Sequence, residues 1–119
     1  MLLNGTKKKI EFEIMQIEKE LQNYSLLFDL IKQQEPDLIE MTALSSVLHS
    51  FYNGIEGIFL IISKNIDENI PKSYNWHSDL LKRMSEKNEI RKNVISEEKF
   101  NQLQEYLGFR HFFRHNYQC

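Results

Sequence analysis

The amino-acid sequence predicts an all-α fold, an antiparallel up-and-down helical bundle. Three observations support this class: the apolar residues recur at helical spacing, the connections between apolar stretches are short, and glycine and proline are scarce, with 4 and 2 in 119 residues. A β-sandwich of this length would need more turn residues. We expect a single helical domain over residues 1–119, because this length suits one hydrophobic core.

The first predicted helix covers residues 8–34. Its apolar positions alternate in steps of four and three, which is the spacing of a seam that packs against neighbouring helices. These positions are Ile10, Ile14, Ile17, Leu21, Tyr24, Phe28 and Ile31. Pro36 then fits the first turn of a second helix, where its missing N–H would have no partner anyway.

The second predicted helix covers residues 36–66 and is apolar around most of its girth. Its stripe consists of Met41, Leu44, Leu48, Phe51, Ile55, Ile58 and Ile62, widened by Val47, Tyr52 and Phe59. Between Glu40 and Lys64 the only charged residue is Glu56, so we expect burial on more than one side. Small residues also align, at Ser46, Ser50, Gly54 and Gly57. They indicate either close packing within the chain or a dimer seam.

Two shorter segments complete the predicted bundle. A third helix over residues 77–86 directs Leu80, Leu81 and Met84 inward, between loops at 65–75 and 85–95. Ser96 is a suitable N-cap for a fourth helix that continues to the end of the chain. Glu97 and Glu98 follow it in the first turn, where acidic groups complement the helix dipole.

Composition narrows the possible functions. The net charge is −2, so a nucleic-acid role must depend on a local patch. The stretch 108–119 supplies one, with two arginines, two histidines and no acidic residue. The single cysteine, Cys119, excludes an intramolecular disulfide and fits a cytoplasmic protein. The longest uncharged apolar run, residues 57–62, is too short to span a bilayer, so we expect no membrane partner.

The apolar face of the fourth helix is interrupted by polar residues. Phe100, Leu103, Tyr106, Leu107 and Phe113 form that face. Arg110 and Tyr117 fall near its middle, and Arg114 lies close by. An arginine in an apolar stripe is costly unless it is paired or reaches a solvated cleft. Two interpretations follow: a buried ion pair with Glu56, or an anion site in a groove where the planar guanidinium binds phosphate.

His111 and His115 lie four residues apart on one flank of this helix. Two histidines are an incomplete ligand set and no HExxH pattern accompanies them, so we expect no metal site. Imidazole titrates near neutral pH and can both accept and donate a proton. Beside an arginine, this pair is better suited to general acid–base chemistry on a phosphodiester.

The run from Arg110 to Tyr117 is similar to the R-x4-H-x-Y motif of HepT toxins, which are HEPN-domain ribonucleases of two-gene toxin–antitoxin systems. Three further stretches resemble the same family: residues 106–109, 48–56 and 76–81. The resemblance extends from about residue 35 onward. The arginine–histidine spacing alone would be weak, but the trailing tyrosine and the matching helix contexts make it fairly specific.

The resemblance implies a metal-independent endoribonuclease that needs no cofactor. By this reading, the RNA 2′-hydroxyl attacks the adjacent phosphate and leaves a 2′,3′-cyclic phosphate. His115 acts as the general base or acid, Arg110 stabilises the developing charge, and His111 assists. Arg114 and Asn116 are expected to bind the substrate.

The resemblance also implies partners. HEPN ribonucleases form homodimers in which two copies of the motif surround a shared cleft. The cognate antitoxin is expected to be a minimal nucleotidyltransferase that attaches AMP to Tyr117. Members of the family continue beyond this tyrosine, so we expect the chain ending at Cys119 to lack the C-terminal helical part.

Two alternatives belong to other functional classes. HEPN-like domains also serve as non-catalytic modules that bind a nucleotide or partner a nucleotidyltransferase. A plain helical interaction domain, with the motif serving only packing, is less consistent with two arginines and two histidines within six residues.

Overall fold

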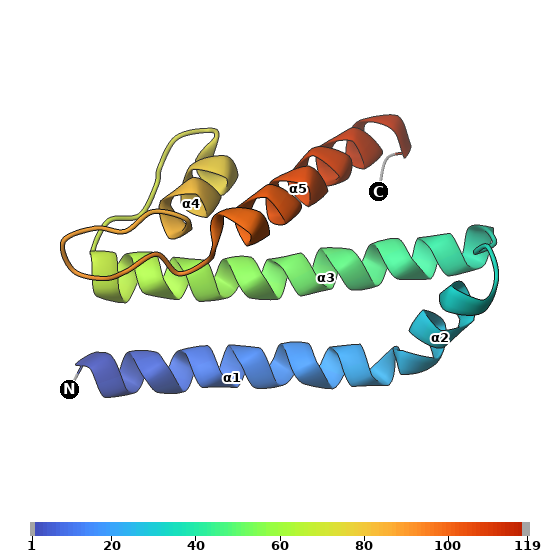
Figure 1. Ribbon diagram of the computed structural model, residues 1–119, viewed down its shortest axis with the longest axis horizontal. Coiled ribbons are helices and arrows are strands. Elements are labelled where there is room, and N and C mark those ends of the chain that lie inside the picture. Colours follow the sequence, from blue (N-terminus) through green and yellow to red (C-terminus); the bar gives the residue numbers. More distant parts are fainter. Residues whose placement is uncertain (1, 118–119) are drawn as a thin grey trace. The chain divides into compact units, whose positions relative to one another are not determined.

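A computed structural model describes the backbone of residues 2–117 and the side chains of residues 5–111. The described backbone consists of helices and connecting loops, without β-strands (Figure 1). The predicted all-α class is confirmed. The chain divides into two compact units, residues 1–58 and 59–119, and each is described by itself. The single domain expected over residues 1–119 stays a prediction.

The N-terminal unit begins with α1 (Leu2–Asn23) and α2 (Ser25–Gln33). The prediction of one continuous helix over 8–34 was therefore wrong. The break is at Tyr24, which has φ −106° and ψ 18°. The N–H of Tyr24 is shared between the carbonyls of Glu20 (3.2 Å) and Leu21 (3.3 Å), as is common at helix ends. The apolar spacing continues without interruption through Tyr24. The sequence pattern therefore gave no indication that the helix ends there.

The long helix α3 (Leu38–Ile62) begins two residues later than predicted. Its start is fixed by a reciprocal capping box between Asp37 and Glu40. The Asp37 carboxylate accepts from the Glu40 N–H at 2.8 Å, and the Glu40 carboxylate accepts from the Asp37 N–H at 3.0 Å. This box satisfies two N–H groups at the helix start. Pro36 therefore precedes the helix instead of occupying its first turn.

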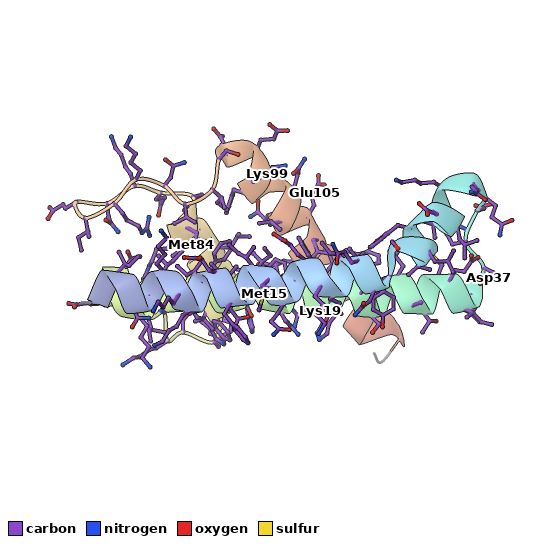
Figure 2. All side chains as sticks on the ribbon, turned by 90° about the horizontal axis from the view of Figure 1, so that it is seen from below. Met15, Lys19, Asp37, Met84, Lys99 and Glu105 are labelled. Atoms are coloured by element: carbon purple, nitrogen blue, oxygen red, sulfur yellow. The ribbon has the colours of Figure 1, made fainter. Side chains whose placement is uncertain are left out.

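Within the N-terminal unit, α1 and α3 run antiparallel and approach closely at a glycine. A Cβ added at Gly54 would lie 2.7 Å from Cγ1 of Ile17, and one added at Gly57 would lie 3.9 Å from Oε2 of Glu13. At Gly54, the aligned small residues therefore serve packing within the chain. Met15 and Lys19 are exposed on α1 (Figure 2).

After Ile62 the helix widens into a π-helical turn, Ser63–Asp67, which was predicted as the end of the second helix and the start of a loop. Glu68 then takes a left-handed conformation with φ 55°. The Asn69 N–H donates to the Ser63 carbonyl at 2.9 Å and closes the turn. Non-glycine residues adopt this conformation uncommonly, and here it ends a helix.

The C-terminal unit contains α4 (Trp76–Met84) and α5 (Glu97–Tyr117). The three residues predicted to face inward from α4 are buried: Leu80, Leu81 and Met84 are at most 1% exposed. Phe59 and Ile62, at the end of α3 within the same unit, are also buried. These side chains form the core of the unit, as the apolar spacing predicted.

The loop between α4 and α5 is irregular, as predicted, and well anchored. Val94 and Ile95 donate their N–H groups to the Met84 carbonyl at 2.8 and 3.2 Å. Ser96 caps α5, with its hydroxyl accepting from the Lys99 N–H at 3.1 Å. The predicted N-cap is therefore confirmed, and it sets where α5 begins.

Candidate functional site

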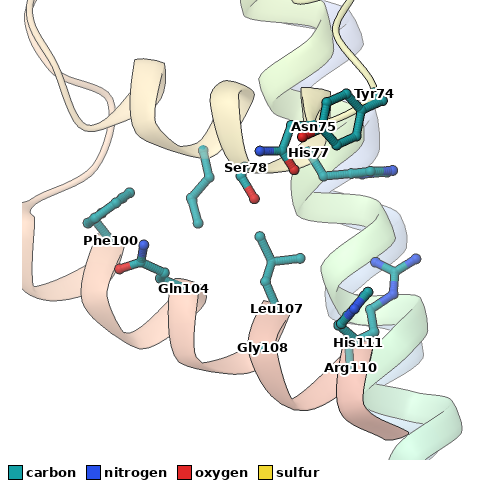
Figure 3. Close-up of a pocket in the computed structure, with 11 residues that line it drawn as sticks. Tyr74, Asn75, His77, Ser78, Phe100, Gln104, Leu107, Gly108, Arg110 and His111 are labelled. Atoms are coloured by element: carbon teal, nitrogen blue, oxygen red, sulfur yellow. The ribbon is translucent and has the colours of Figure 1, made fainter. Parts of the chain in front are cut away.

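The C-terminal unit contains a pocket of about 560 Å³ between α4 and α5 (Figure 3). One wall comes from α5 and includes the motif residues Arg110 and His111. The other wall comes from the start of α4 and the loop before it, and includes Tyr74 and His77. The volume lies in the range of about 300–1,000 Å³ that is typical of small-molecule sites.

Arg110 and His111 are consecutive residues, yet both line the pocket. Arg110 is half-buried, with its Nη1 atom shielded from solvent, and His111 is exposed. Arg110 therefore lies at a pocket wall. The interpretation of this position as an anion site stays a prediction. The pairing of Arg110 with Glu56 also stays a prediction, because Glu56 belongs to the other unit.

The α4 wall is held in place by local polar contacts. The Ser73 hydroxyl donates to Asp79 Oδ2 at 2.7 Å and accepts from the Asn75 N–H at 3.2 Å. The Trp76 N–H donates to the Ser73 carbonyl at 3.1 Å. Together these bonds fix the chain as it enters α4, and so position the side chains that line the pocket.

His77 is the chemically most versatile group on this wall. Its ring stacks on that of Trp76, with centroids 3.6 Å apart and an interplanar angle of 28°. Sequence reasoning did not identify His77 or Tyr74 as site residues. The available signal was a histidine in the first turn of a short helix, but the pairing of α4 with α5 is a tertiary contact that spacing along the chain does not encode.

The remaining predicted site residues are Arg114, His115, Asn116 and Tyr117. The backbone of α5 is helical through Tyr117, so the whole motif runs along one helix. Arg110 and His115 are therefore about 140° apart around the helix axis. The side chains of residues 112–117 lie outside the part that the structure describes. The roles predicted for Arg114, His115, Asn116 and Tyr117 therefore stay predictions.

The pocket is suited to an anion. Among its lining residues are an arginine and two histidines, and none is an aspartate or glutamate. Within the side chains that the structure describes, no group of three His, Cys, Asp or Glu residues is arranged to hold a metal ion. The planar arginine fork matches the geometry of phosphate as well as that of carboxylate, so a phosphate is one anion that this pocket suits.

No helix in the described part of the chain has the length and apolar character needed to cross a membrane. Comparison with curated proteins gave no match, and comparison with solved structures gave none either. Residues 43–119, about two thirds of the sequence, match the family described as HepT-like protein. The matched region includes most of α3, all of α4 and α5, and the complete R-x4-H-x-Y motif. The chain therefore belongs to the HepT-like family.

Proposed function

We propose that this protein is the toxin of a toxin–antitoxin pair and acts as a metal-independent endoribonuclease. The observation that carries the proposal is the placement of Arg110 and His111 on the wall of one pocket without carboxylates. Membership of the HepT-like family supports the same function. An arginine at this wall suits a phosphodiester, and the neighbouring histidine suits proton transfer.

In the proposed reaction, the ribose 2′-hydroxyl loses its proton and its oxygen attacks the adjacent phosphorus. The bond from phosphorus to the 5′-oxygen breaks, and that oxygen takes up a proton. The products are a 2′,3′-cyclic phosphate and a 5′-hydroxyl. His115 accepts or donates one of these protons, and Arg110 stabilises the negative charge that builds on the phosphate oxygens.

The geometry of α5 favours a homodimer as the active species. Positions 110 and 115 are about 140° apart around an ideal helix, so a single chain presents Arg110 and His115 poorly to one phosphate. Two chains that place their α5 helices around a shared cleft would surround it. In this arrangement, Arg114 and Asn116 bind the flanking RNA. The partner that silences the toxin is a minimal nucleotidyltransferase, which attaches AMP to Tyr117.

The test is RNA cleavage by the purified chain in EDTA, beside the variants His115→Ala and His49→Ala. His49 is a control histidine that lies in the other unit. The parent is expected to cleave RNA in EDTA, because the reaction requires no metal. His49→Ala is expected to cleave RNA as well, because the proposed reaction gives His49 no role. His115→Ala should lose at least about two orders of magnitude in rate, the usual contribution of a general acid or base.

Analysis of the cleaved ends makes the test specific. The proposed chemistry requires a 2′,3′-cyclic phosphate, and it requires that a 2′-deoxy substrate resists cleavage. Cleavage that EDTA abolishes, or that His115→Ala retains, would refute the proposal. Nucleotide binding without turnover would favour the non-catalytic HEPN module instead.

A further inference from the structure

The pocket between α4 and α5 has two chemically different ends. The basic end is the one with Arg110, His111 and His77, and the apolar end is the one with Phe100 (Figure 3). Leu81 and Leu107 also line the pocket. In Figure 3, Arg110 and His111 lie at one end of the pocket and Phe100 at the other, with Gln104 near Phe100. A nucleotide has the same division, because an anionic phosphate is joined through a sugar to a flat base with apolar faces.

We propose that this pocket holds one unstacked nucleotide of single-stranded RNA, with its phosphate at the basic end and its base at the apolar end. The proposal rests on the ribonuclease function proposed above and extends it to α4, which lies outside the R-x4-H-x-Y motif. It assigns two further groups to substrate binding: His77 to the phosphate and Gln104 to the base.

The basic end is suited to a phosphate because donors reach it from both walls. Arg110 and His111 come from α5, and His77 comes from α4. The stacking of His77 on Trp76 restricts the orientation of the imidazole. A ring restrained in this way loses less conformational entropy when it binds a ligand.

The apolar end is suited to the face of a base. Phe100 and Leu107 are half-buried, so each presents apolar surface to the pocket. Gln104 lies one helical turn from Phe100, is exposed, and lines the same pocket. Its amide can both donate and accept hydrogen bonds, as the edge of a base requires.

The ligand must be single-stranded because a base can enter a pocket only after it leaves its stack. Tyr74 supports this view. It lines the pocket and is 98% exposed, so its ring is available to a base outside the pocket. Exposed aromatic rings beside basic groups commonly stack neighbouring bases of single strands.

Gly108 permits a test that blocks the pocket without disturbing the fold. Gly108 lines the pocket and is exposed, and no described atom lies within 4 Å of a Cβ built there. The variant Gly108→Leu fills the pocket with a residue that favours helix more than glycine does. Gly5→Leu is a matched control, because Gly5 is also helical and exposed, also has no described atom within 4 Å of an added Cβ, and lies in α1.

The measurement is fluorescence anisotropy with a labelled 2′-O-methyl pentaribonucleotide, which binds without being cleaved. At one fixed salt concentration, Gly108→Leu should weaken binding by on the order of tenfold, the typical effect of losing one base contact. Gly5→Leu should bind as the parent does. Gln104→Ala should weaken binding, whereas Gln102→Ala should not, since Gln102 is exposed on α5 outside the pocket lining.

The outcomes separate this proposal from the ribonuclease function. Cleavage that depends on His115 but is unchanged in Gly108→Leu would overturn the pocket assignment and leave the ribonuclease intact. Binding that depends on Gly108 and Gln104, without cleavage, would support the pocket and reject the ribonuclease. Equal binding of a duplex of the same sequence, or no binding by the parent, would overturn the assignment.

Discussion

Among the side chains that the structure describes in the C-terminal unit, Arg91 makes an extended set of polar contacts. Its Nε and Nη2 atoms donate to the two carboxylate oxygens of Asp67 at 2.8 and 2.7 Å. Its Nη1 donates to the carbonyls of Glu86 and Lys92, each at 3.0 Å. Asp67 also accepts from the Asn88 side chain at 3.3 Å. This network ties the loop before α5 to the turn after α3.

Removing the Arg91 side chain should destabilise the protein strongly. The Asp67 side chain is only 4% exposed, so Arg91→Leu leaves a buried carboxylate without its charged partner. Such a change typically costs about 3 kcal/mol or more. Urea unfolding followed by circular dichroism measures it, with Lys92→Leu as the exposed neighbouring control. A loss below about 1 kcal/mol would mean that the pair behaves as a surface ion pair.

Tyr117 is the residue through which we propose that the antitoxin acts. Co-expression with the cognate nucleotidyltransferase should increase the intact mass by one or more AMP units, and Tyr117→Phe should abolish the increase. Tyr74→Phe is the control, because Tyr74 is a highly exposed tyrosine elsewhere in the unit. An AMP adduct that persists in Tyr117→Phe would show that the target was misassigned.

Residues on the α5 wall of the pocket stood out in the sequence because the anomaly there was local. An arginine within an apolar stripe is visible in the spacing alone, and Arg110 does line a pocket. Tyr74 and His77 produced no such anomaly. Tyr74 lies in a proline-containing loop, and His77 lies in the first turn of the short helix that follows it. Their relevance depends on which helix packs against them. That choice is made by tertiary packing.

At the level of helices, the predictions succeeded where capping groups mark an end. Ser96 predicted the start of α5, and the structure places its hydroxyl on the Lys99 N–H. The reciprocal pair of Asp37 and Glu40 is an equally readable signal for the start of α3. The prediction relied on Pro36 and was two residues early. The break at Tyr24 involves neither glycine nor proline, so no residue type in the sequence indicated a helix end there.

The cap on α5 is expected to contribute measurably to stability. Ser96→Ala removes the acceptor of the Lys99 N–H and should cost about 1 kcal/mol. Ser96→Asp should retain most of the stability, because aspartate caps helices as well as serine does. Thermal unfolding compares the two variants with the parent. Ser46→Ala is the control, because Ser46 is an exposed serine in the interior of α3 and caps no helix end. A melting temperature unchanged by Ser96→Ala would show that the cap is dispensable.

At the level of the whole molecule, the central expectation is that two chains share one active site. This follows from the proposed chemistry, because Arg110 and His115 diverge on a single helix while the reaction requires both at one phosphate. Sequence spacing along α5 is sufficient to state this requirement. How the two chains are arranged depends on contacts between their surfaces. The spacing of residues along one chain therefore does not predict that arrangement.

Subunit mixing tests this expectation directly. Sedimentation should give a mass twice the 14.3 kDa of the chain, both for the parent and for His115→Ala. After the parent is mixed and equilibrated with excess His115→Ala chains, most parent chains will be in mixed dimers. If the two motifs form one site, cleavage per parent chain should fall well below that of the unmixed parent. If each chain acts alone, cleavage per parent chain should stay constant at every mixing ratio, and the shared site would be excluded.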